Sequence, residues 1–390
     1  WSLAPHWPGE DVIQLLATLS GGLFIWAATA FKFIQAFNPP TRLKQLLAAG
    51  EIIHNDLDQL YSMALEHAGD WTNATFSFSA LSLVACVILS REPLTAETMT
   101  SIICYGQEEL GMPVLEFLGS VLHWGPGVPL STLHASFSDY ITDPNRSGTK
   151  PWFIDINLHS EFLATRCFQV LAHKLRFNIC NIETSHVLNS DVPDLAERVG
   201  THIPESLKYV SQYWAHHLHA TATSPAPIVL DGLKTFASQH FLYWLEVLSL
   251  LGHVSGAHEA VEIAQTYAQG KDQALEALLH EGIKFIAGFA PAISQSMPHL
   301  YISALAMVPH KSVIRQHYGK NWHYRMQFEG ASAENWSNLL KLFPGHRDSI
   351  TSVAFSHDSS RVVSGSRDFT VHIWDSKTGT VVAGPFEGHS

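Results

Sequence analysis

The chain has 390 residues, of which 46% are hydrophobic and 15% are charged, and its formal net charge is −12. This composition predicts folded cores and argues against a disordered chain. The acidic balance disfavours non-specific binding to nucleic acid or to an anionic membrane, because both need a basic field.

The first helical region, residues 11–50, contains a stretch of twenty uncharged residues, 12–31. Its length alone would suffice for a membrane span. The polar side chains within it and the Gly21-Gly22 break instead favour two short buried helices joined at the glycines. A further short helix is expected after Asn38-Pro39-Pro40, over residues 42–49.

Residues 57–157 have a different pattern. Helices are expected near 57–65, 78–89, 95–104 and 112–123, followed by a strand at 128–130, a helix at 133–141 and a strand at 152–156. This order is typical of a winged-helix domain. The helix that would enter DNA carries Glu116 and no Lys or Arg, so we expect it to pack against protein and not to bind nucleic acid.

The next region, residues 158–330, follows helical periodicity throughout, including a helix over 273–289 that is expected to end in a turn at Pro291. Metal sites are not expected in it. His258 and His280 each begin an H-E-x-x-H pattern whose second histidine is missing, and the histidines at 216, 217 and 219 are interpreted as a solvated helix face.

At Trp336 the periodicity changes from 3.6 to 2, which predicts strands at 336–343, 350–355, 361–364, 370–374 and 381–383. Two Gly-His pairs, Gly345-His346 and Gly388-His389, lie 43 residues apart. A period of about 40–45 residues with a Trp-Asp pair is typical of a WD-repeat β-propeller blade. Because a propeller needs about 4–8 blades, we expect the chain, which opens without Met, to be a fragment.

The polar residues of this blade have an expected structural role. They resemble the hydrogen-bonded set that pins blade strands together, and their buried polar groups need partners. Their positions are Gly345, His346, Ser364, Asp368, Trp374 and Asp375.

The sequence contains neither a G-x-x-x-x-G-K-[ST] phosphate loop nor a G-x-S-x-G elbow. We therefore expect no catalytic residues and no enzyme activity from this chain. The four cysteines lie in apolar runs without C-x-x-C spacing, which predicts free thiols in a reducing, cytoplasmic setting.

Several segments resemble the fungal NACHT and WD-repeat proteins, large intracellular receptors similar to the NOD-like receptors. These segments are GGLFIWAATA at 21–30, LHASFSDYI at 133–141, YWAHHL at 213–218 and the Trp-Asp repeat. The resemblance implies a NACHT nucleotide-binding core upstream in the same chain, further blades downstream, and ADP or ATP (or GTP) with Mg in the full-length protein. It also implies that His134 is the nucleotide sensor, although Ala135 stands where the family's motif has Asp. A capped core histidine is the alternative role for His134.

The sequence thus predicts a mainly α fold: a helical lid (1–56), a winged helix (57–157), an all-helical linker (158–330), and a C-terminal antiparallel β-meander that is the first blade of a truncated β-propeller (331–390). We expect a regulatory, ligand-sensing part of a NOD-like-receptor-type switch for self/non-self recognition or regulated cell death. It would bind protein partners through the propeller and oligomerise on activation. The alternative is a non-switching WD-repeat scaffold with a helical stalk.

Overall fold

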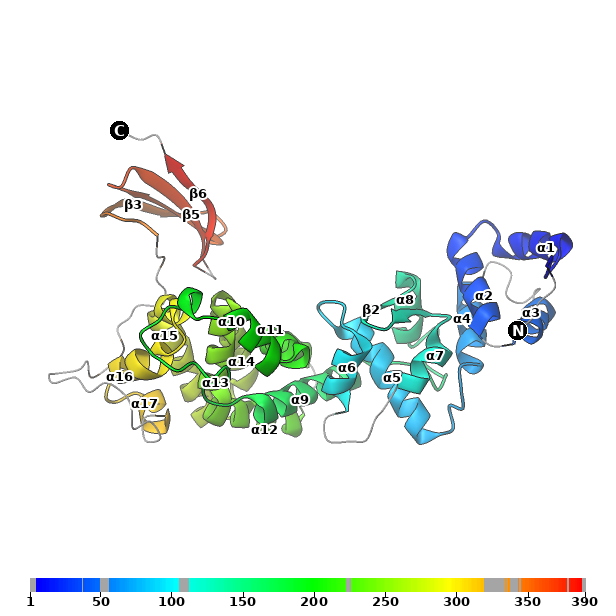
Figure 1. Cartoon of the computed structure of the whole chain (residues 1–390), viewed down its shortest axis with the longest axis horizontal. Coiled ribbons are helices and arrows are strands. Elements are labelled where there is room, and N and C mark those ends of the chain that lie inside the picture. The colour runs from blue at the N-terminus through cyan, green and yellow to red at the C-terminus, as the bar shows by residue number, and fades with distance from the viewer. Residues whose placement is uncertain are drawn as a thin grey trace. The chain divides into compact units, whose positions relative to one another are not determined.

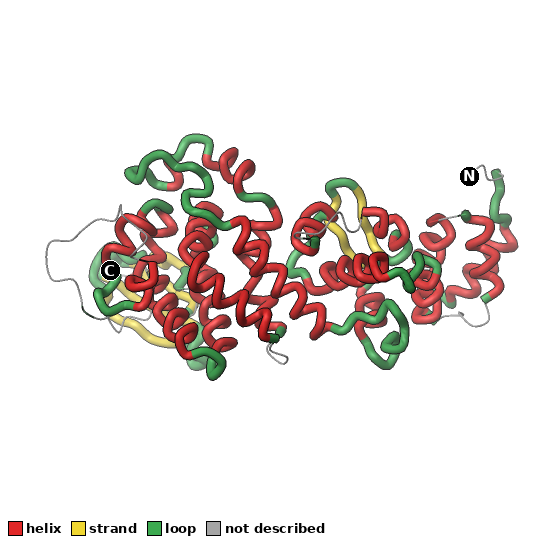
Figure 2. Tube along the Cα trace, turned by 90° about the horizontal axis from the view of Figure 1, so that it is seen from below, coloured by secondary structure: helices red, strands yellow, loops and turns green. Residues whose placement is uncertain are grey.

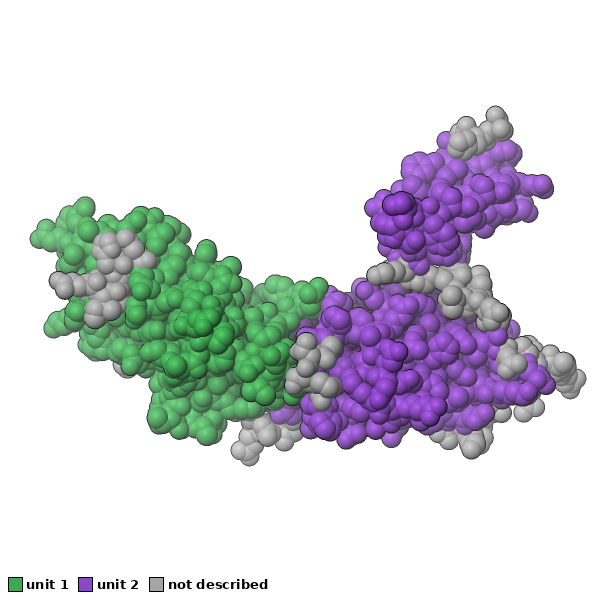
Figure 3. Space-filling model, turned by 180° about the vertical axis from the view of Figure 1, so that it is seen from behind, with its two compact units in different colours: residues 1–163 green, residues 164–390 purple. Residues whose placement is uncertain are grey.

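The computed structural model describes residues 5–36, 38–49, 56–104, 112–221, 226–318, 334, 336, 343, 345–376 and 379–387. The chain divides into two compact units, residues 1–163 and 164–390 (Figure 3). Most of the described residues are helical, and the last strands form an antiparallel sheet (Figure 2). The expected mainly α fold with a C-terminal β-meander is therefore confirmed.

Unit 1 is made of short helices and one β-hairpin (Figure 1, blue to cyan). Its elements are α1 (Glu10–Ser20), α2 (Phe24–Ala36), α3 (Pro39–Ala48), α4 (Leu57–Glu66), α5 (Ala74–Leu89), α6 (Ala96–Ile103), α7 (Met112–Leu118), β1 (Leu122–Gly125), β2 (Val128–Thr132) and α8 (Ala135–Thr142). Helix α9 (Ile156–Lys174) contains the boundary between the two units.

The uncharged N-terminal stretch is broken where the glycines predict it. Gly21 and Gly22 have φ of 54° and 83°, a left-handed conformation that suits glycine and separates α1 from α2. Within the described residues, no helix is long and apolar enough to cross a membrane. The expectation that both helices are buried is met only in part. Helix α2 buries one face, which includes Trp26 and Phe33, and leaves Phe24 exposed. Helix α1 buries only Leu19 and Ser20, and its apolar side borders an open cavity.

Two details of the region after residue 111 differ from the sequence prediction. Helix α7 ends at Leu118. Leu122 and His123 belong to β1, because they pair with residues of β2. No strand forms at 152–156. Instead Ile154 N–H donates a single hydrogen bond to Ile141 O (2.9 Å), and Asp155 caps α9 by accepting from Asn157 N–H (2.9 Å).

Unit 2 begins as a helical block (Figure 1, green to yellow). It contains α10 (Leu195–His202), α11 (Glu205–Ala220), α12 (Pro227–Thr235), α13 (Phe241–Leu251), α14 (Ala257–Ala268), α15 (Gln273–Gln295), α16 (Leu305–Met307) and α17 (Val313–Tyr318), with π-helical turns at Phe236–His240 and Leu300–Ala304. Helix α15 continues through Pro291, so the predicted turn there is wrong. Its last turn is held in the core by Ile293, which is completely buried.

The core of this block is aromatic. Trp214 packs against Phe236 with ring centroids 4.7 Å apart, and against Trp244 in an edge-to-face contact at 5.7 Å. The expected solvated face of three histidines is wrong for His217, which is buried and lies 2.8 Å from Tyr209 OH through its Nε2.

The C-terminal sheet has four antiparallel strands in the order β3-β4-β5-β6 (Figure 1, orange to red). They are β3 (Ile350–Phe355), β4 (Arg361–Ser366), β5 (Thr370–Asp375) and β6 (Val381–Glu387), at the positions that period-two alternation predicts. The outer strand predicted at 336–343 lies almost wholly outside the described residues, and so does the second Gly-His pair.

Candidate functional site

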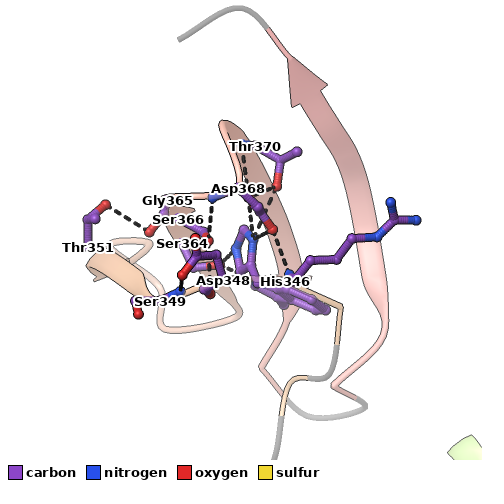
Figure 4. Close-up of polar contacts among 11 residues, drawn as sticks. His346, Asp348, Ser349, Thr351, Ser364, Gly365, Ser366, Asp368 and Thr370 are labelled. Carbon is purple, nitrogen blue, oxygen red and sulfur yellow. Dashed lines mark hydrogen bonds and ion pairs between the residues drawn. The ribbon is translucent and has the colours of Figure 1, made fainter. Parts of the chain in front are cut away.

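A hydrogen-bonded chain crosses the C-terminal sheet (Figure 4). Trp374 Nε1–H donates to Ser364 Oγ (2.7 Å), and Ser364 Oγ lies 2.8 Å from His346 Nε2. His346 Nδ1 in turn lies 3.1 Å from Asp368 Oδ2. Because indole N–H can only donate, one consistent direction runs from Trp374 through the Ser364 hydroxyl and the His346 ring to the carboxylate.

Asp368 ends this chain and also organises the turn between β4 and β5. It accepts hydrogen bonds from Arg347 N–H (2.7 Å) and the Thr370 hydroxyl (2.6 Å). Burial acts to raise the pKa of Asp368, but the hydrogen bonds from Thr370, Arg347 and His346 outweigh it and hold the pKa well below its usual range. The carboxylate therefore stays charged and fixes its three donors.

The order Ser364, His346, Asp368 imitates a catalytic triad, but its surroundings do not suit catalysis. Ser364 is 4% exposed, and its oxygen already accepts the Trp374 N–H. A nucleophile must reach a substrate, which a buried hydroxyl under an indole cannot do. The arrangement pins strands β4 and β5 together and presents no reactive group.

The remaining two blade residues complete the same structure. A Cβ at Gly345 would lie 2.7 Å from Trp374 Cη2, so the indole occupies the space that a side chain would need. Asp375 closes the β5–β6 turn through its backbone, with its N–H on Thr380 O and its O accepting from Gly379 N–H, both at 2.9 Å. The structure thus brings the six predicted residues together, four on strands β4 and β5 or the turn between them and Gly345 with His346 on the segment before β3.

Two further residues belong to this cluster but are not among those that the sequence predicts for it. The Thr370 hydroxyl donates a hydrogen bond to Asp368. The His372 ring stacks on Trp374 with ring centroids 5.0 Å apart, and it contacts the His346 ring edge-on with centroids 4.5 Å apart. His372 alternates with Ile373 along β5, so strand period two could have placed it on the Trp374 face.

His134 lies in unit 1 at the start of α8, away from the sheet in sequence. It is exposed and acts as the N-cap residue, accepting a hydrogen bond at Nδ1 from Ser136 N–H (3.1 Å). The imidazole of His134 thus caps the helix, and Ala135 at the first helical position brings no negative charge to the helix N-terminus.

A cavity of about 550 Å³ borders His134. One wall is α2, through Phe24, Ile25, Ala28, Phe31 and Lys32, and the other is Leu133 with His134. Phe24 is 88% exposed and Phe31 57%. The cavity therefore combines an open apolar wall with one ammonium and one imidazole.

No group of three or more His, Cys, Asp or Glu side chains in the described part of the chain is placed to hold a metal ion. Cys86 and Cys180 offer no reactive thiolate, since burial raises the pKa of each thiol to about 11.

Comparison with known proteins first defines the class of the C-terminal sheet. Residues 337–375 match the family model of the WD domain, G-beta repeat. The transcriptional repressor rco-1 of Neurospora crassa is 52% identical to this chain over 40 residues, 10% of this chain and 7% of that protein. The mitochondrial division protein 1 of Schizosaccharomyces pombe is 43% identical over 53 residues, 14% of this chain and 8% of that protein. The chain carries a WD repeat.

A wider similarity then covers nearly the whole chain. The vegetative incompatibility protein HET-E-1 of Podospora anserina is 26% identical over 388 residues, which is 93% of this chain and 28% of that protein. Together with the WD repeat, this similarity confirms the resemblance to the fungal NACHT and WD-repeat proteins. The chain spans only about 28% of the length of this relative.

Proposed function

We propose that this chain is the regulatory and ligand-sensing part of an intracellular switch of the NOD-like-receptor type, acting by protein–protein interaction. The observation that carries the proposal is the similarity along 93% of the chain to a vegetative incompatibility protein. The signalling outcome proposed here is self/non-self recognition or regulated cell death, in the cytoplasm. The WD repeat supports binding of protein partners, because blades act as rigid surfaces whose loops carry specificity.

In this proposal residues 57–157 act as a winged helix beside a NACHT nucleotide-binding domain, and residues 158–330 link them to the propeller. His134 and Lys32 would hold the phosphates of ADP at the α2 cavity, and the apolar wall of Phe24 and Phe31 would face the rest of the ligand. These residues fit such a group, since both polar side chains can donate to anionic oxygen. When bound, the nucleotide supplies the negative charge of its phosphates. The closed and the open state of the switch would differ in their affinity for this charge.

The test is ADP release from the longer protein that carries the NACHT domain. We expect His134→Leu to speed release by about ten- to a hundredfold, which corresponds to losing one hydrogen bond to a charged group, about 1.5–3 kcal/mol. His123→Leu, at an exposed histidine on β1 that does not line the cavity, is the matched control. Unchanged release from His134→Leu would contradict the switch and favour the non-switching scaffold.

A further inference from the structure

The N-cap bond of α8 favours one tautomer of the His134 ring. Ser136 N–H donates to Nδ1 at 3.1 Å. A backbone N–H has no lone pair to offer, so Nδ1 must carry its lone pair rather than a proton. A neutral imidazole has one N–H, which in this geometry is on Nε2.

A second hydrogen bond reaches the same nitrogen. The Ser136 hydroxyl lies 2.8 Å from His134 Nδ1, and Tyr61 OH lies 2.9 Å from Ser136 Oγ. Since Nδ1 accepts, the Ser136 hydroxyl donates to it, and the Tyr61 hydroxyl can then donate to Ser136. Two donors share the single Nδ1 lone pair, in the manner of a three-centre bond.

This relay starts in the core and ends at an exposed ring. Tyr61 on α4 is 1% exposed, and its ring meets Phe137 of α8 edge-on with centroids 5.3 Å apart. The tyrosine position is therefore set by packing. Nε2 accepts or donates no hydrogen bond within the described residues, and His134 lines the α2 cavity together with Lys32.

We propose that Ser136 and Tyr61 are positioning residues that hold His134 as its Nε2–H tautomer, so that this N–H is available to an anionic oxygen, such as that of a phosphate, in the α2 cavity. The contacts that set this tautomer come from a serine two positions after the histidine and from a tyrosine that lies 75 residues before that serine. The identity of the ligand rests on the proposed function, whereas the tautomer is a property of this chain alone.

The tautomer can be measured on the chain as it is. Long-range proton–nitrogen correlation spectra of ¹⁵N-histidine-labelled protein, recorded at a pH above the ordinary pKa range of imidazole, report the protonation of each ring nitrogen. His134→Gln identifies the His134 signals by their loss. We expect Nε2 to show the shift of a protonated nitrogen and Nδ1 that of an unprotonated one, with no averaging between them.

Free imidazole already favours the Nε2–H tautomer and keeps a fraction of the Nδ1–H tautomer. The test of the relay therefore comes from substitutions at Ser136 and Tyr61. The backbone N–H of residue 136 still donates to Nδ1 in Ser136→Ala and Tyr61→Phe. These two variants should therefore move the two nitrogen shifts only part of the way toward each other, and Ser136→Thr, which keeps the hydroxyl, should restore the wild-type values. A merely structural role for Ser136 would leave the shifts where they are in all three folded variants.

Matched controls lie on the same two helices. Ser62→Ala and Tyr140→Phe break a comparable bond, Ser62 Oγ to Tyr140 OH at 2.8 Å, without touching His134. They should leave the His134 shifts unchanged, and a shift as large as that of Ser136→Ala would overturn the specific relay. Tyr61→Phe keeps the ring contact with Phe137, so one relay variant is expected to fold even if Ser136→Ala does not.

Titration with inorganic phosphate, and in a second experiment with ADP, distinguishes the proposed tautomer of His134 from the proposed nucleotide contact. A single tautomer with a phosphate-dependent Nε2 shift that is lost in Lys32→Gln supports both. If the tautomer is single but neither probe moves Nε2, the positioning role stands and the proposed nucleotide contact is contradicted. An averaged tautomer in the wild-type protein overturns the inference whatever the probes do.

Discussion

At Glu246 burial and charge conflict directly. Its side chain is completely buried on α13, and its oxygens accept hydrogen bonds from Ile179 N–H (2.6 Å), Asn178 N–H (3.0 Å) and Tyr301 OH (2.5 Å). Burial raises the pKa of Glu246 to about 7, against the opposing effect of the Tyr301 and backbone hydrogen bonds. One carboxyl group thereby ties the loop after α9 to the π-helical turn at Leu300–Ala304.

This pKa predicts how the stability of unit 2 depends on pH. The folded chain keeps a proton on Glu246 up to about pH 7, whereas the unfolded chain releases it near the ordinary value of 4.5. The unfolded state therefore binds fewer protons between these values, and the free energy of unfolding should fall as pH rises through this window, by about 3 kcal/mol in total.

Urea unfolding at a series of pH values measures this dependence, and Glu246→Gln should flatten it. Glu259→Gln, at an exposed glutamate on α14, should leave the slope as it is. A slope that persists in Glu246→Gln would show that another group causes it.

At the scale of elements, helix α12 meets α9 at a glycine. A Cβ on Gly232 would lie 2.9 Å from both Cβ and Cδ2 of Phe168, closer than such atoms approach. Phe168 is itself packed against Trp214 and Phe236, with ring centroids 5.7 and 6.0 Å away, so it has little room to move. The close approach of the two helices therefore depends on the missing side chain.

We expect Gly232→Ala to destabilise unit 2 by about 1–3 kcal/mol through overpacking, despite the better helix propensity of alanine. Gly288→Ala is the matched control: it lies inside α15 and its Cβ would meet nothing within 4 Å. That change should raise stability by about 0.5–1 kcal/mol. Thermal unfolding of both variants measures these changes in stability. An equal gain in stability in the two variants would contradict the close contact between Gly232 and Phe168.

Elements were predictable from sequence where a local signal defines them. The helix expected near 95–104 forms as α6 with Thr95 as its N-cap residue, and the four strands of the sheet follow from alternation between turns. The contacts that give the sites their chemistry join distant residues, such as Ile179 with Glu246, 67 positions apart, or Tyr61 with Ser136. Periodicity carries no information about such pairs. For this reason His217 was expected to face solvent, and His134 was predicted as a site residue without the other residues of its cavity.

For the molecule as a whole, the exposed apolar side chains of β3 are the feature most relevant to association. Val353 and Phe355 lie on one face of the strand and are 58% and 68% exposed. Exposed apolar sheet surface favours pairing between copies. We expect a double variant, Val353→Thr with Phe355→Thr, to lower concentration-dependent self-association, as measured by light scattering.

Leu158→Thr provides the comparison for that variant. Leu158 is 63% exposed but lies on helix α9, outside the sheet. Its replacement should leave self-association as in the wild type. If the two variants behave alike, general surface hydrophobicity and not the β3 face governs association.

The polar chain from Trp374 to Asp368 has a thermodynamic consequence for the sheet. Among the described residues 345–387, the buried apolar side chains are only Val362 and Trp374, while Ser364 and His372 are buried polar ones. The heat capacity of unfolding and the sensitivity to denaturant both scale with the surface that unfolding exposes. Opening of this sheet should therefore depend weakly on urea, and its free energy should vary almost linearly with temperature. Hydrogen exchange in β4 and β5 would then report hydrogen-bond strength almost free of the hydrophobic effect.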